Sequence, residues 1–170
     1  MIVIIAGTTH TGKTALAQRL LEKYTFPYLS LDHLKMGLIR SGKTDVSGCD
    51  DEKLTPYLWS IVMEIIKTAI ENGQNLIIEG CYIPFDWQKD FTKEYLAEIK
   101  YYCLIMSEHY IQNYFAEILA NESAIEKRLV SGGITQEELI RNNELNLLMC
   151  KQYGLNYILI DNEYKVDIKL

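Results

Sequence analysis

The chain is short of positive charge. Its 170 residues hold 17 lysines and arginines against 23 aspartates and glutamates, which gives a formal net charge of −6. Proteins that bind nucleic acids in general need a basic face to neutralise the phosphates. The composition therefore argues against a nucleic-acid partner, although it leaves room for one locally basic phosphate pocket.

Cysteines, histidines and long apolar runs are also scarce. The four cysteines are widely spaced with no C-x-x-C pair, and the three histidines have no zinc-site spacing. No apolar run approaches the length of a membrane span. The first strand-like run begins at Met1, where a signal peptide would otherwise lie. We therefore expect reduced thiols, no membrane partner and a cytoplasmic location, with no prediction of oligomeric state.

The most informative segment lies near the start. Residues 7–14, GTTHTGKT, complete the phosphate-loop pattern G-x-x-x-x-G-K-[ST]. The glycines let several backbone N–H groups converge on a phosphate, Lys13 adds a charge, and Thr14 offers a hydroxyl to Mg²⁺. The apolar run at 2–6 and the helical stripe after Lys13 supply the required strand and helix. The predicted nucleotide-binding residues are Gly7, Thr8, Thr9, His10, Thr11, Gly12, Lys13, Thr14 and Ala15.

Strand-like and helical patterns alternate along the rest of the chain. Strands are predicted at 2–6, 27–31, 75–79, 99–106 and 155–160. The predicted helices are 13–24, 32–41, 55–72 with Thr55 as cap and Pro56 in the first turn, 87–97, one starting at Glu108, and one over 135–153. This alternation predicts a single α/β domain with a parallel sheet covered on both faces.

Ligands of such sheets bind at the carboxyl ends of the strands, and two carboxylates follow predicted strands there. Asp32 follows the second strand and could orient or deprotonate an attacking hydroxyl, although a helix cap is the simpler role. Glu79 ends the third strand and could hold Mg²⁺ or contact the substrate. Gly80 permits close approach of the backbone, so Asp32, Glu79 and Gly80 are predicted substrate residues.

The planar arginine side chain binds phosphate well, and two of the four arginines lie at positions where they could contact a phosphate or an anionic substrate. Arg40 follows Asp32 by about two helical turns, at the mouth of the polar segment 41–53, which we interpret as a mobile loop. Arg40 could bind an anionic group of the substrate. Arg128 precedes Gly132 and Gly133 and could neutralise transition-state charge. A solvated helix face is the alternative for both arginines.

Three segments together resemble the small P-loop kinases of the adenylate-kinase superfamily. They are the phosphate loop, residues 28–40 (YLSLDHLKMGLIR) and residues 75–80 (NLIIEG). Within that group the chain is similar to bacterial proteins described as 2-phosphoglycerate-kinase-like or zeta-toxin-like. The run after Glu79 lacks the arginine that nucleoside monophosphate kinases carry there.

The resemblance implies a three-layer fold with a five-stranded parallel sheet in the order 2-3-1-4-5 and a helical lid. It implies one kinase domain over 1–170, with an acceptor region at about 33–54 and a lid at about 115–135. It also implies Mg²⁺·ATP as donor, Asp32 as the base, Glu79 in a strand-three Glu-Gly pair, and Arg128 as a lid arginine.

The leading hypothesis is an ATP-dependent kinase acting on a small-molecule acceptor, with Lys13, Asp32 and Arg128 as catalytic residues and Thr14 and Glu79 at the metal. The alternatives are a nucleoside monophosphate kinase, a zeta-type toxin kinase and an ATP-binding protein without transfer activity. A GTPase is disfavoured because no N-K-x-D guanine motif occurs.

Overall fold

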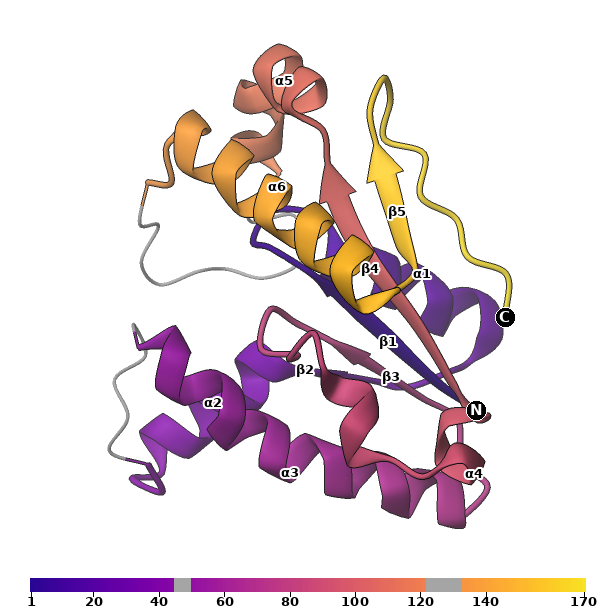
Figure 1. Ribbon diagram of the computed structural model, residues 1–170. Coiled ribbons are helices and arrows are strands. Elements are labelled where there is room, and N and C mark those ends of the chain that lie inside the picture. Colours follow the sequence, from indigo (N-terminus) through magenta and orange to yellow (C-terminus); the bar gives the residue numbers. More distant parts are fainter. Residues whose placement is uncertain (45–49, 122–132) are drawn as a thin grey trace.

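Five parallel strands form one sheet in the order β2-β3-β1-β4-β5, as expected (Figure 1). The computed structural model describes residues 1–44, 50–121 and 133–170. Its strands are β1 (Ile2–Gly7), β2 (Tyr28–Ser30), β3 (Leu76–Glu79), β4 (Ile99–Met106) and β5 (Tyr157–Ile160). Its helices are α1 (Lys13–Tyr24), α2 (Leu31–Arg40), α3 (Asp51–Glu71), η1 (Trp87–Asp90), α4 (Lys93–Leu96), α5 (Glu108–Ala120) and α6 (Gln136–Tyr153).

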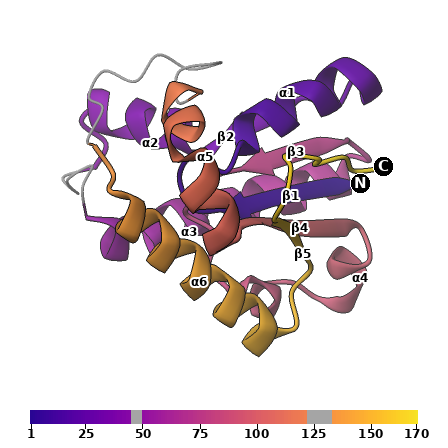
Figure 2. The same cartoon turned by 90° about the horizontal axis from the view of Figure 1, so that it is seen from above.

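The sheet separates two apolar layers, because successive residues of a strand point to opposite faces. Val3 and Ile5 of β1 pack with α1 and α5 on one face. Ile2 and Ile4 pack with α3 and the last turn of α6 on the other. The view from above shows α1 and α3 on opposite sides of β1 (Figure 2). The fold is therefore the predicted three-layer α/β arrangement.

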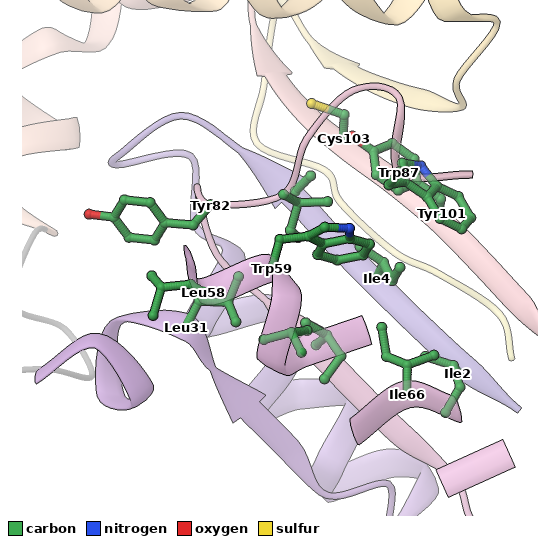
Figure 3. Close-up of a cluster of buried hydrophobic side chains, with 14 of the residues drawn as sticks. Ile2, Ile4, Leu31, Leu58, Trp59, Ile66, Tyr82, Trp87, Tyr101 and Cys103 are labelled. Atoms are coloured by element: carbon green, nitrogen blue, oxygen red, sulfur yellow. The ribbon is translucent and has the colours of Figure 1, made fainter. Parts of the chain in front are cut away.

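The face covered by α3 holds an aromatic cluster (Figure 3). Trp87 stacks on Tyr101 of β4 with ring centroids 5.5 Å apart, and Phe91 meets Trp59 edge-on at 6.1 Å. The Trp59 indole N–H donates to Asp90 Oδ2 at 2.8 Å. This packing connects α3 to the segment between β3 and β4.

Two helix predictions were wrong. Helix α3 begins at Asp51 rather than at Pro56, and Asp50 is its cap through a bond from the Lys53 N–H at 3.3 Å. Leu54 and Leu58 are both buried on one helix face, so apolar burial extends the helix ahead of Pro56 despite the lost backbone bond. As a result, part of the predicted loop 41–53 is helical.

The predicted helix 87–97 is interrupted. Residues 87–90 form the 3₁₀ turn η1, Phe91 is extended with φ −126° and ψ 145°, and α4 covers only 93–96. The extended backbone at Phe91 accompanies the edge-on packing of its ring against Trp59 and Trp87. Aromatic burial therefore prevails over the local helical pattern.

The core under α3 should be sensitive to truncation. Leu58→Ala removes a side chain with no exposed surface and should lower the free energy of unfolding by about 2–5 kcal/mol. The matched control is Leu148→Ala on α6, where the leucine is 61% exposed and the change should be about 0.5 kcal/mol or less. Urea unfolding followed by tryptophan fluorescence measures both, and equal effects would contradict this description of the core.

Candidate functional site

The phosphate loop connects β1 to α1 through a backbone that curls around its own interior. Gly7, His10 and Gly12 have positive φ angles of 138°, 65° and 81°. Left-handed residues interspersed with right-handed ones are the backbone pattern of an anion-binding nest, in which successive N–H groups turn toward one side. Gly7 has no room for a side chain, because an added Cβ would lie 2.6 Å from the Leu104 carbonyl oxygen.

The Lys13 side chain folds back over this loop. Its ammonium donates to the Thr8 carbonyl oxygen at 2.8 Å, and Thr11 Oγ1 donates to the same oxygen at 2.9 Å. Lys13 is only 7% exposed. A buried ammonium beside converging N–H groups is a strong binding site for a phosphate oxyanion.

Thr14 and Glu79 meet at the mouth of the loop. Residue Ile5 of β1 lies opposite Glu79 of β3 in parallel register, so β3 delivers the carboxylate beside the first turn of α1. Thr14 Oγ1 donates to Glu79 Oε1 at 3.3 Å, and Glu79 is 2% exposed. The two side chains offer the hard oxygen ligands that Mg²⁺ prefers, with the remaining positions left for water and phosphate.

These features fit Mg²⁺ and a nucleotide phosphate. The nest, the buried Lys13 ammonium and the Thr14–Glu79 oxygen pair lie within one loop and its neighbouring strand. Among the residues that the structure describes, no cluster of three or more His, Cys, Asp or Glu side chains could hold a metal by itself. A Mg²⁺ ion held by few protein ligands, with phosphate and water at its other positions, needs no such cluster.

A second polar cluster lies at the start of α2. Lys35 Nζ contacts Asp32 Oδ1 at 3.0 Å and donates to the Tyr82 hydroxyl at 2.7 Å. Burial of the Lys35 ammonium lowers its pKa, but the hydrogen bonds to Tyr82 and Asp32 outweigh burial, so the pKa of Lys35 is raised overall. The cluster is thus an ion pair attached to a tyrosine, with the Lys35 side chain 14% exposed.

Gly80 allows this cluster to form next to β3. A Cβ at Gly80 would lie 2.7 Å from Leu31 Cβ, which only a glycine avoids. The start of α2 therefore packs directly against the chain that leaves β3, and Asp32 and Tyr82 come from these two segments. Close approach of backbone was the predicted role of Gly80.

Of the two arginines predicted to act here, Arg40 is within the described residues. Arg40 is exposed in the last turn of α2, eight residues and about 12 Å along the helix axis from Asp32. Arg128 lies outside the described residues, as does most of the predicted lid at 115–135, of which residues 115–120 end α5.

The site residues predicted from the sequence do not include Lys35, Tyr82 or Tyr164, which the structure brings to the two clusters. The Tyr164 hydroxyl donates to the Thr11 carbonyl oxygen within the phosphate loop at 3.0 Å. The alternation of apolar and charged residues over 164–168 was an available signal that this segment packs on the domain. No motif marks these three residues, and the Lys35–Tyr82 and Tyr164–Thr11 contacts join residues that are distant in sequence.

Solved structures share this fold. A proposed kinase from Chloroflexus aurantiacus is 18% identical with a TM-score of 0.57, over 98% of this chain and 91% of that chain. A sugar kinase from Janibacter sp. has a TM-score of 0.54 at 14% identity, over 94% of this chain and 84% of that one. Shikimate kinase from Bacteroides thetaiotaomicron has a TM-score of 0.51 at 16% identity, over 95% and 86%.

The phosphate loop, the strand order and these structures together give the chain the fold of a small P-loop kinase. No protein-family profile and no curated protein matches the sequence of this chain. Over residues 1–44, 50–121 and 133–170, no helix is long and apolar enough to span a membrane.

The Thr14–Glu79 pair should control the magnesium dependence of nucleotide binding. Glu79→Gln keeps the shape and can still accept the Thr14 bond, but it removes the charge that attracts Mg²⁺. We expect the gain in ADP affinity on adding Mg²⁺ to shrink about tenfold, measured by calorimetry with Mg²⁺ and with EDTA.

The control for that experiment is Glu137→Gln, because Glu137 is exposed in the first turn of α6. It should keep the full gain on adding Mg²⁺. An unchanged gain in Glu79→Gln would remove Glu79 from the metal site.

Proposed function

We propose that the protein is an ATP-dependent kinase that transfers the γ-phosphoryl group of Mg²⁺·ATP to a hydroxyl group of a small molecule. The observation that carries this proposal is that the phosphate loop and a second polar cluster lie at the same edge of the sheet. The phosphate loop follows β1, and the Asp32–Lys35–Tyr82 cluster follows β2 and β3, with β3 between β1 and β2. The similar folds of the kinases described above support the proposal.

The donor side is provided by the loop. The N–H groups of the nest and Lys13 would bind the β- and γ-phosphates, while Thr14 and Glu79 would hold Mg²⁺. When bound, the metal ion neutralises charge on the phosphate oxygens. Lys13 adds a fixed positive charge that needs no reorganisation during transfer, because Thr8 already holds its ammonium.

The acceptor side is provided by the cluster on α2. Asp32 would accept a hydrogen bond from the acceptor hydroxyl and orient its oxygen toward the γ-phosphorus. During transfer the hydroxyl oxygen forms the new bond to phosphorus and the bond from the γ-phosphorus to the bridging oxygen breaks. ADP leaves with that electron pair, and the hydroxyl proton passes to Asp32.

The charge of the cluster favours an acceptor that carries an anionic group. Lys35 has three N–H donors, and the contacts above use one for Asp32 and one for Tyr82. The third is available to an anionic oxygen near the reacting hydroxyl. A carboxylated or phosphorylated hydroxy compound of the 2-phosphoglycerate type fits this distribution of charge.

Asp32→Asn should abolish transfer and leave nucleotide binding intact. The amide keeps the size of the side chain but cannot take a proton, so turnover should fall at least about a hundredfold. The measurement is transfer of labelled phosphate from ATP to a panel of hydroxylated acids, sugars and nucleoside monophosphates, with calorimetry of ADP binding beside it.

Two further variants complete the experiment. Lys13→Ala sets the background, and Asp167→Asn is the matched control, because Asp167 is exposed and forms an ion pair with Lys23 at 3.6 Å, away from both clusters. Full turnover by Asp32→Asn would remove Asp32 from the mechanism. Rapid turnover of a nucleoside monophosphate would favour a nucleotide kinase, and ADP binding without transfer to any acceptor would favour a binding protein.

A further inference from the structure

The segment after β5 returns to the phosphate loop. Figure 1 shows this yellow segment running from the end of β5 back past α1 to the C-terminus. Along this path the Tyr164 hydroxyl donates to the Thr11 carbonyl oxygen at 3.0 Å, across 153 positions of sequence. The two ends of the described fold are therefore joined at the nucleotide-binding loop itself.

The segment that carries Tyr164 is fixed to α1. Val166 and Ile168 are buried in the same apolar layer as Leu16 and Leu20 of α1. Arg19 Nη2 donates to the Val166 carbonyl oxygen at 2.9 Å. Because α1 begins at the phosphate loop, these contacts hold the Tyr164 phenol at a set distance from Thr11.

The bond to Thr11 has a consequence for the next N–H group. A trans peptide is planar, so the Thr11 C=O and the Gly12 N–H point in opposite directions. The described chain contains no cis peptide. When Tyr164 holds the Thr11 carbonyl on the outer side of the loop, the Gly12 N–H must point away from Tyr164.

Gly12 is covered closely by the same phenol. An added Cβ at Gly12 would lie 2.0 Å from the Tyr164 hydroxyl oxygen, and the Gly12 φ angle is 81°. Burial raises the pKa of Tyr164, so the phenol keeps its proton and acts as the donor. Tyr164 therefore covers the loop on the side where a Gly12 side chain would lie. A ligand would have to bind on the opposite side.

We propose that Tyr164 is a positioning residue for the nucleotide phosphates, which fixes the peptide between Thr11 and Gly12 so that the Gly12 N–H points into the anion-binding nest. This inference rests on the proposed function, because it requires that the loop bind phosphate. It assigns a role in nucleotide affinity to a residue outside the phosphate-loop motif.

The test is Tyr164→Phe, which removes the hydroxyl and keeps the ring. With one hydrogen bond lost, we expect the affinities for Mg²⁺·ADP and for Mg²⁺·pyrophosphate to fall together by about fivefold in calorimetry. Pyrophosphate carries no base, so an equal loss for both ligands places the effect at the phosphates. The Gly12 amide resonance should also shift in the ligand-free protein.

Two further variants separate positioning from general stability. Tyr164→4-aminophenylalanine restores a donor at the same place and should regain most of the lost affinity. Tyr153→Phe removes the hydroxyl of an exposed tyrosine on α6 and should leave both affinities unchanged. Thermal unfolding of each variant measures stability independently of ligand.

The outcomes are distinguishable. If Tyr164→Phe lowers the unfolding temperature but binds both ligands like the wild type, Tyr164 is only structural and the inference is wrong. If only ADP affinity falls, Tyr164 contacts the base and the inference is also wrong. If the wild-type protein binds neither ligand, the proposed function itself fails.

Discussion

The central position of β1 is the constraint on which the other features depend. Residues Ile2–Gly7 are buried throughout, and β1 pairs in parallel with β3 on one side and β4 on the other. Parallel pairing places the carboxyl ends of these strands at one edge of the sheet. The phosphate loop, Glu79 and the start of α2 consequently lie together, although they are far apart in the sequence.

The same arrangement buries two opposite charges near the loop. Lys13 and Glu79 are among the few charged or polar side chains buried in the described residues. Removing an ion from water costs several kcal/mol, so such groups stabilise a fold poorly unless they are well paired. Their burial agrees with the nucleotide-binding role proposed above, because desolvated charges interact more strongly with a bound phosphate or metal ion.

Much of the fold followed from local patterns. The five strands, the helix after the phosphate loop and the last helix, α6, agree with the sequence prediction. The errors lie where apolar burial competes with local preference. Pro56 lies inside α3 because Leu54 and Leu58 share a buried face, and the helix predicted over 87–97 is interrupted at Phe91, whose ring packs against Trp59 and Trp87.

By itself the sequence determined the chemistry of the phosphate loop and the positions of Asp32 and Glu79 after strands. These features are local, because a strand, a glycine turn and a helix start are each specified within a few residues. Only the tertiary structure decided which side chains meet. Lys35 meets Tyr82 across 47 positions and Tyr164 meets Thr11 across 153, because hydrophobic periodicity specifies which face is buried but not which partner it meets.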